Sequence, residues 1–438
     1  MKTEMRSWVE TFRYLFNVKD DYGRGRLYML LTLLLLGIAE QFYGGVFFTR
    51  FLLAYGIDQT GVGVLTFLPY LGCLISIFSP YILERFQRRK WILFFSGMIT
   101  NFFSIMGITL LPMIVEDAGQ RLMGFIAITV GTTLINNLFS AGGVTWNAAY
   151  LPEHVKADYM ATSQMLNNLI CWGIALAVSI VADQFAGTEH EMPLIICVRC
   201  IGWGLTVINS ILLLVKKEFP YTHTEKTKLS NVFILPFGNK LYRGTMLVAF
   251  VCCIVHYLPN ATINVYLLED LKISYTLING LNAVYFVFGL LFANMWAGFT
   301  KKHGWFVTLA VAVVLQSFTY FVYAFVQADN TWLYIVVRLA QHFVGVPFDL
   351  VMVSFIYINL PMEDTTYYVT FAGFIINIAT FLAMFIGTVV TKIMGETVLS
   401  IFGVNFVSTQ VLLLVCAVGK LLVAALSVLW SRKISSGL

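Results

Sequence analysis

Three ionisable side chains stand close together in an otherwise apolar stretch at residues 331–357. Arg338, His342 and Asp349 are separated by steps of four and seven residues, so a helix would place them on one stripe. Together they could relay protons, or the arginine could bind an anionic group of a solute. Alternatively, the three charges could form a buried network that only holds the helix in register.

A second candidate for proton chemistry is Glu40, the only acid deep within the apolar stretches of the first half of the chain. Gly37 and Gly44 share its helical face and would allow a helix or a ligand to approach closely. Burial disfavours the charged form of a carboxyl group, which suits a group that takes up and releases a proton. We therefore predict proton coupling at Glu40, His342 and Asp349. For Glu40, the alternative is a structural carboxyl group bonded to a neighbouring helix.

Two further apolar stretches carry polar or aromatic side chains at positions i, i+4 and i+8, one over residues 164–172 and the other over 256–264. Pro259 interrupts the second stretch, and broken helices line the cavities of transporters. Amides can hydrogen-bond a hydroxyl-rich solute, although they also hold membrane helices together. We predict a solute site made of Asn136, Asn137, Gln164, Asn168, Trp172, His256, Asn260, Asn264, Asn282, Tyr285, Arg338 and Asn377.

Helices that cross a bilayer must position these residues. A helix needs about 20 apolar residues to cross the ~30 Å hydrocarbon core, and about twelve stretches of that length follow one another in the chain. The sequence therefore predicts an all-α membrane protein with twelve transmembrane helices in two pseudo-symmetric six-helix bundles. The predicted spans are 27–49, 60–83, 91–113, 121–147, 158–182, 193–215, 243–268, 275–299, 304–326, 331–357, 368–391 and 403–430.

The composition supports this class. Of the 438 residues, 59% are hydrophobic and 12% are charged, about half the charged fraction of a soluble protein. Most of the 28 Lys and Arg lie in connections on one side of the predicted membrane, which makes that side and both termini cytoplasmic. The net charge of +5 therefore indicates membrane topology and not nucleic-acid binding. The seven cysteines all lie within spans and do not form a disulfide framework.

The longest connection is basic and divides the chain at its midpoint. We predict a cytoplasmic N-terminal segment at 1–26 that could form an amphipathic helix, and a six-helix bundle at 27–215. A cytoplasmic linker at 216–242, a second bundle at 243–430 and a tail at 431–438 follow. The halves look like copies, because residues 151–168 recur as 360–377 and Met29 is echoed by Met246. Parallel six-helix repeats build one large transporter fold.

With this duplication, the whole chain resembles the major facilitator superfamily. That family usually carries Gly-x-x-x-Asp-Arg-x-Gly-Arg-Arg or a similar motif between spans 2 and 3. Residues 79–90 read Ser-Pro-Tyr-Ile-Leu-Glu-Arg-Phe-Gln-Arg-Arg-Lys, with Glu84 in place of the aspartate, and residues 298–304 echo them. The resemblance implies a cytoplasmic gate that latches the halves together, whereas the alternative is a positively charged loop with no latch. The gate residues would be Glu84, Arg85, Arg88, Arg89, Lys301 and Lys302.

We predict a secondary active transporter that moves a small polar solute by alternating access, in symport with protons. A carbohydrate or glycoside is the preferred solute, because amides and aromatic rings outnumber fixed charges in the spans. No phosphate-binding loop and no nucleophile with a base is present, so we expect neither ATP hydrolysis nor enzymatic activity. The alternatives are a drug or lipid exporter or flippase of the same superfamily, and a membrane sensor that transports nothing.

The expected partners are a small-molecule solute and the lipid bilayer, with no nucleic acid, no metal and no cofactor besides the proton gradient. We expect a monomer, placed as a multi-pass protein in the cell membrane, which is the inner membrane if the source is bacterial.

Overall fold

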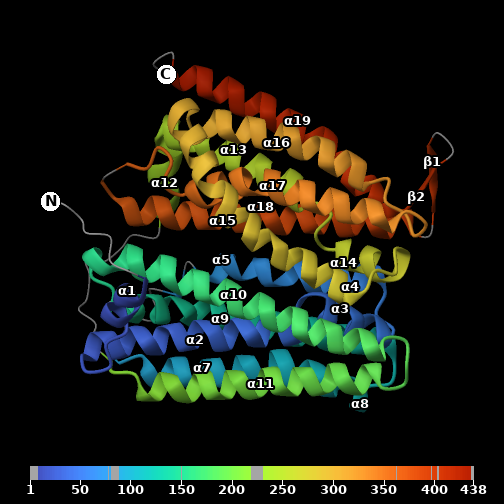
Figure 1. Cartoon of the computed structure of the whole chain (residues 1–438), viewed down its shortest axis with the longest axis horizontal. Helices are drawn as coiled ribbons and strands as arrows, with labels where there is room; N and C mark the ends of the chain where they lie inside the picture. Colours follow the sequence, from blue (N-terminus) through green and yellow to red (C-terminus); the bar gives the residue numbers. More distant parts are fainter. Residues whose placement is uncertain are drawn as a thin grey trace. The chain divides into compact units, whose positions relative to one another are not determined.

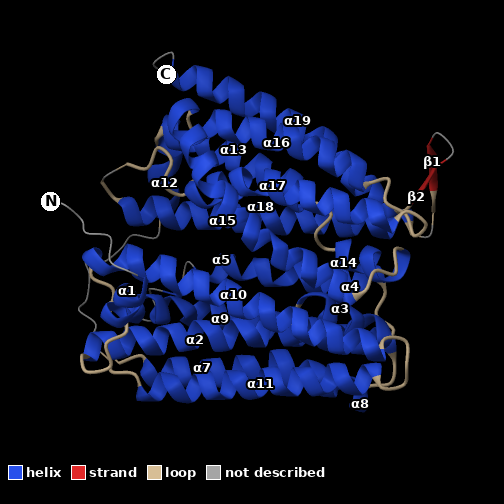
Figure 2. Cartoon of the chain, in the orientation of Figure 1, coloured by secondary structure: helices blue, strands red, loops and turns tan. Residues whose placement is uncertain are grey.

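The computed structural model describes residues 8–76, 78–79, 88–148, 150–218, 230–361, 363–395, 397–401 and 404–435. Nearly all of this part of the chain is helical, apart from one short two-stranded hairpin (Figure 2). Eleven helical segments of the described chain are long and apolar enough to cross a membrane. The predicted span that is missing from these eleven is the seventh, which begins with α13 (Lys240–Tyr257), a helix of 18 residues with two basic side chains among its first four. The predicted all-α, multi-pass architecture is confirmed.

Contacts between Cα atoms divide the chain into two compact units, and unit 1 comprises residues 1–51 and 75–225. Within it, α2 packs on α10 and α11, and α7 packs on α9 and α11. The helix α3 begins in this unit and ends three residues beyond it. The elements are α1 (Trp8–Leu15), α2 (Asp21–Tyr43), α3 (Gly45–Ala54), α7 (Lys90–Asn101), the π-helical turn η2 (Phe102–Gly107), α8 (Ile108–Ile114), α9 (Ala118–Ala148), α10 (Glu153–Phe185) and α11 (Glu191–Val215) (Figure 1).

Unit 2 comprises residues 52–74 and 226–438. Its helix α16 packs along α17 and α19, α13 packs on α18 and α19, and α15 packs on α17. The elements are α4 (Gln59–Phe67), the 3-10 turn η1 (Leu68–Gly72), α5 (Cys73–Ser76), α12 (Asn231–Gly238), α13, α14 (Ile263–Val265), the π-helical turn η3 (Tyr266–Asp270), α15 (Tyr275–His303), α16 (Trp305–Tyr323), α17 (Thr331–Ser354), α18 (Thr365–Met394), β1 (Leu399–Ile401), β2 (Val404–Phe406) and α19 (Ser408–Ser435). The antiparallel strands pair Leu399 with Phe406.

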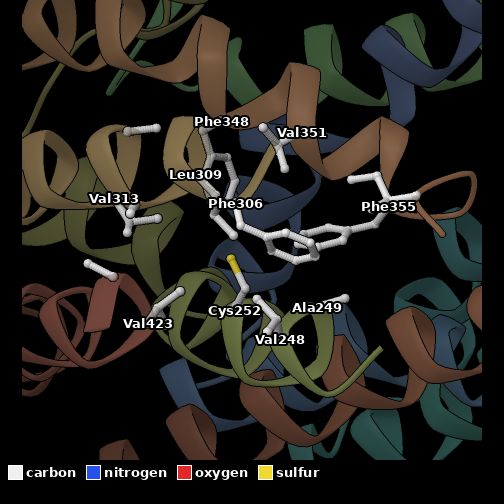
Figure 3. Close-up of a cluster of buried hydrophobic side chains, with 14 residues drawn as sticks. Val248, Ala249, Cys252, Phe306, Leu309, Val313, Phe348, Val351, Phe355 and Val423 are labelled. Carbon is white, nitrogen blue, oxygen red and sulfur yellow. The ribbon is translucent and has the colours of Figure 1, made fainter. Parts of the chain in front are cut away.

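The core of unit 2 is a buried apolar cluster between α13, α16, α17 and α19. Side chains such as Cys252, Leu309, Phe348 and Val423 meet there, each at most 2% exposed (Figure 3). Polar groups that enter this cluster lose their water and must find partners within the protein. The cluster therefore sets the environment of the buried polar side chains on the same four helices.

Each unit contains a short helix that docks on two long ones. In unit 1, α1 packs on α2 and α10, and residues 15 and 16 join Met29 and Tyr159 in a buried cluster. In unit 2, α12 packs on α13 and α18, and Val232 joins Met246 and Tyr368 in a second cluster. The methionine and tyrosine positions that match in the sequence repeat thus have the same packing role in both units.

Two of the predicted connecting segments contain helix. The predicted linker 216–242 contains α12 and the first residues of α13, while residues 219–229 lie outside the described ranges. The predicted tail 431–438 begins inside α19, which continues to Ser435. Apolar side chains of α12 explain the first difference, because Val232 is 6% exposed against the neighbouring helices.

Two spans are interrupted. The first span breaks between α2 and α3, where Gly45 has a φ of +54°, a conformation that glycine adopts readily. The seventh breaks after Tyr257, because Pro259 has no N–H to donate and its ring opposes a continuing helix. The chain turns there, with the N–H groups of Thr262 and Ile263 donating to the carbonyl of Pro259 over 3.1 and 3.0 Å.

Candidate functional site

The ionisable stripe of α17 faces α15. Nη2 of Arg338 donates to Oδ1 of Asn282 over 2.8 Å, and Nε2 of His342 lies 2.8 Å from the carbonyl oxygen of Leu281. Asp349 accepts a hydrogen bond from the hydroxyl of Tyr285. The structure therefore brings five predicted residues, three from α17 and two from α15, into one polar seam, which we call the α15–α17 seam.

The seam has unused hydrogen-bonding capacity. Nε of Arg338 is buried without an acceptor among the described residues, while its Nη1 donates to Oε1 of Gln341 over 2.9 Å. A buried donor without an acceptor costs about 1–3 kcal/mol. Asp349 is exposed within the chain and His342 is buried. An oxygen-rich solute could supply the missing acceptor to Arg338 and donate hydroxyl groups to Asp349.

A second polar group lies in unit 2 and was missed in the sequence. Lys420 of α19 is 1% exposed, and its Nζ donates to Oε1 of Gln316 over 2.7 Å and lies 3.1 Å from Nδ1 of His256. The rings of Tyr320 and Phe348 lie 4.4 and 5.0 Å away. A lysine in an apolar stretch was the available signal, because a charge inside a span is costly and therefore has a partner.

The predicted helical row of His256, Asn260 and Asn264 is wrong. Its helix ends at Tyr257, so the last two side chains lie in the turn and in α14 and do not continue the face of α13. Both are half-buried. The turn is tied down instead by hydroxyl and amide groups. Thr409 donates to Thr262 over 3.1 Å, and Gln59 donates to Thr409 over 3.1 Å.

In unit 1, Glu40 lies in the last turn of α2 and is exposed within the chain. Its carbonyl accepts the N–H of Gly44 over 2.8 Å at the break of the first span. A Cβ on Gly37 would lie 2.7 Å from side-chain atoms of Asn167 and Cys171, so the predicted close approach of a helix is confirmed, and the helix is α10. The role of Glu40 in proton coupling stays a prediction.

The other predicted amides bond within their own helices. Gln164 donates to Asn168 over 3.0 Å along α10, as the spacing predicted, and Trp172 is half-buried on the same helix. Asn137 and Asn377 donate to carbonyls four residues earlier, over 3.0 and 2.8 Å, whereas Asn136 is exposed. These bonds show which residues share a helix face, and they leave the predicted solute contacts open.

Arg199 is a second buried cation whose hydrogen-bond partners were not predicted from the sequence. Its side chain is fully buried in unit 1, with Nε 2.7 Å from Oγ1 of Thr109. Nη1 and Nη2 donate to the carbonyls of Tyr43 and Ile105 over 2.9 and 3.3 Å. The guanidinium lies 4.6 Å from the centre of the Phe51 ring. This side chain thus joins the end of α2 to the π-helical turn η2.

The predicted gate is only partly described. Glu84 and Arg85 lie outside the described residues, Arg88 is exposed, and Lys301 and Lys302 are exposed in the last turn of α15. The backbone N–H of Arg89 donates to the carboxylate of Glu218, as does that of Lys90 over 3.0 Å. The gate therefore stays a prediction.

Beside Glu218, just beyond the end of α11, Lys216 is 4% exposed and bonds Asn147. Its Nζ lies 4.7 Å from the Trp146 ring and 4.8 Å from the Tyr150 ring. Burial lowers the pKa of Lys216 to about 7 and raises that of Tyr150 to about 12. The lysine is therefore only partly charged near neutral pH.

No protein-family model matches the chain, and no curated protein matches its sequence significantly. Solved structures match it along nearly its whole length. A mutant of the nucleoside transporter NupG has a TM-score of 0.68 at 12% identity, covering 93% of this chain and 99% of that one. A bacterial homologue of the iron transporter ferroportin has a TM-score of 0.66 at 14% identity, covering 93% and 98%.

A D-xylose-proton symporter also has a TM-score of 0.66 at 14% identity, covering 92% of this chain and 96% of that one. At these identities the matches concern the fold, and substrates and residue roles do not transfer with it. The three matches each cover at least 92% of this chain. The chain therefore has the fold of the major facilitator superfamily, as the resemblance in its sequence implied.

Proposed function

We propose that this protein is a secondary active transporter that moves a small hydroxyl-rich solute across the membrane by alternating access, in symport with protons. The observation that carries the proposal is the α15–α17 seam. Arg338, His342 and Asp349 lie together on a membrane-crossing helix, and the buried Nε of Arg338 has no acceptor among the described residues. Ionisable groups are costly in a span and mark pathways for solutes or protons.

A carbohydrate or glycoside is the solute class we favour. Amide, hydroxyl and guanidinium groups in the seam match the hydroxyl and ring oxygens of such molecules. The solved structures of similar fold include a nucleoside transporter and a D-xylose-proton symporter, and nucleosides are themselves glycosides. That similarity is one of fold, so it supports the solute class without identifying the solute.

We further propose that both termini are cytoplasmic, because basic residues concentrate in the connections on their side. In this orientation, the loop at 79–90 and the end of α15 would form the cytoplasmic gate. Accessibility of single cysteines placed at exposed positions, such as Lys19 and Lys302, to an impermeant thiol reagent in oriented vesicles would test this orientation.

The experiment that tests the function uses purified protein in liposomes and a panel of radiolabelled xylose, glucose, uridine, adenosine and a β-glucoside. Uptake is compared with and without an inward proton gradient. We expect accumulation of at least one panel member only with the gradient, and its loss in Arg338→Gln. The matched control is Arg432→Gln, an exposed arginine on α19. Absence of transport for every solute under both conditions would contradict the proposal.

A further inference from the structure

Lys420 and His256 form a basic pair beside the apolar cluster of unit 2, with the lysine buried and the histidine half-buried. Nζ of Lys420 lies 3.1 Å from Nδ1 of His256, and Nζ also donates to Oε1 of Gln316 over 2.7 Å. The imidazole of His256 stacks on Phe348 with 4.3 Å between ring centres. Among the described residues, Lys420 takes part in no ion pair with a carboxylate. The pair is thus held by three helices, with α13, α16 and α19 each supplying one polar group.

Two basic nitrogens at this distance cannot both be charged in a low-dielectric interior, because like charges repel strongly there. When the proton is on Lys420, the ammonium donates to the lone pair of Nδ1 and the histidine is neutral. When the proton moves to His256, its Nδ1–H donates to the lone pair of the neutral amine. The hydrogen bond survives in both forms, so the proton can move between the nitrogens without rearrangement of the helices.

The pair also lies against the helix that carries the α15–α17 seam. Nζ of Lys420 lies 5.0 Å from the centre of the Phe348 ring, and the next residue of α17 is Asp349, which accepts the hydroxyl of Tyr285. The other titratable groups that lie against the pair among the described residues are Cys252 and Tyr257 of α13, Tyr320 of α16 and Cys416 of α19. Thiols and phenols are ordinarily neutral near pH 7. Asp349 is therefore the anionic group that responds to a proton on the pair.

We propose that Lys420 and His256 share one exchangeable proton and form the site through which the proton gradient drives this transporter. The inference rests on the proposed function and extends it to two residues outside the predicted coupling set of Glu40, His342 and Asp349. A proton on the pair offsets the negative charge of Asp349, and loss of that proton leaves the charge uncompensated. Occupancy of the pair thus changes the electrostatics of the seam that would bind solute.

Proton binding can be measured without knowing the solute. The full-length protein in detergent is titrated between pH 5 and 9, and bound protons are counted with a pH electrode. Lys420→Arg preserves size and hydrogen bonding but stays charged over this range, so His256 beside it stays neutral. We expect this variant to take up one proton fewer than the wild type. The matched control, Lys392→Arg at an exposed position of α18, should take up the same number.

Equal proton uptake by Lys420→Arg and the wild type would overturn the proposal, provided that both elute as folded monodisperse protein. Should Lys420→Arg fail to fold, the double variant Lys420→Gln/His256→Gln supplies the same comparison. It removes both nitrogens, and we again expect one proton fewer. An unchanged count in the double variant would also overturn the proposal.

Transport in liposomes separates this inference from the proposed function. Lys420→Arg should lose gradient-driven accumulation at least tenfold yet keep solute exchange across the membrane. Full accumulation by this variant would overturn the proton site while leaving the transporter proposal intact. If the wild type moves none of the panel solutes, the proposed function fails, and the proton count then decides separately whether the pair titrates.

Discussion

The carbonyl oxygen of Tyr43 accepts a hydrogen bond of 2.9 Å from Nη1 of Arg199, at the residue where α2 ends. A helix that stops inside a membrane leaves carbonyl groups without intrahelical partners, and lipid offers none. The same guanidinium also reaches Ile105 in the π-helical turn of the third span. One fully buried cation therefore satisfies two irregular stretches of backbone in unit 1.

Arg199→Met should lower the thermal unfolding temperature in detergent. The substitution leaves two buried carbonyls without their donor, and it also removes the cost of burying the charge. We expect the net loss in the free energy of unfolding to be about 2 kcal/mol. Arg199→Lys should recover only part of the loss, because one ammonium cannot reach three acceptors in a fork. Arg432→Met, at an exposed site on α19, is the control. A fully stable Arg199→Met protein would show that the fork is dispensable.

Gly387 of α18 packs directly against the backbone at the broken end of α13. A Cβ at this position would lie 2.0 Å from the carbonyl oxygen of Leu258, whereas one on Gly373, on the same helix, would meet nothing within 4 Å. Gly387→Ala should therefore force α18 away from the turn and lower the unfolding temperature. Gly373→Ala should leave it unchanged or raise it, since alanine favours a helix by up to about 1 kcal/mol. Equal effects of the two substitutions would contradict this packing.

The order of the helices could be predicted from the sequence, because the thickness of a bilayer fixes the length of an apolar stretch. The stripe of Arg338, His342 and Asp349 was equally predictable, since it depends on the spacing within one uninterrupted helix. The row from His256 to Asn264 failed for the opposite reason. Pro259 was noted as an interruption, and yet the helical spacing was continued across it.

The partners of Arg199 and Lys420 could not be predicted from the sequence. Thr109 and His256 lie 90 and 164 residues away along the chain from the side chains that they bond. Local spacing carries no information about contacts of that range. The sequence does show that a charged residue lies within a span. Such a residue requires a partner, but the sequence does not identify which residue it is.

Arg50 and Glu191 form a two-pronged ion pair in unit 1. Nε and Nη2 of the arginine lie 2.9 and 3.0 Å from the two carboxylate oxygens, and the N–H of Gly187 donates to the same carboxylate over 3.0 Å. Glu191 is 5% exposed, so either single substitution leaves a charge without its partner. We expect Arg50→Met and Glu191→Gln each to lower the free energy of unfolding by about 1–3 kcal/mol. This is less than the cost of breaking a fully buried ion pair, because the arginine is only half-buried.

A double-mutant cycle checks that expectation. Both single substitutions break the same interaction. The loss of stability in the double variant should therefore be smaller than the sum of the two single losses, by about 1 kcal/mol or more. Unfolding temperatures of the four proteins in one detergent supply the comparison. Strict additivity would mean that the pair contributes through its surroundings and not through its own contact.

Lys216 should make the stability of the protein depend on pH in the neutral to alkaline range. Burial beside Trp146 and Tyr150 lowers its pKa from 10.5 to about 7 in the folded chain. Between these two values the unfolded chain holds a proton that the folded chain has lost, so the free energy of unfolding rises with pH. Below pH 7 both states are protonated, and this group contributes no further slope.

Lys216→Met should therefore be more stable than the wild type at pH 6, with the advantage shrinking steadily as the pH rises from 7 to 9.5. The measurement is the unfolding temperature of both proteins in detergent at half-unit pH intervals. Lys19→Met, at an exposed position before α2, should follow the wild-type profile throughout. Parallel profiles for Lys216→Met and the wild type would mean that the lysine keeps its ordinary pKa despite the surrounding rings, because only a difference in proton affinity between the folded and unfolded chain can create the slope.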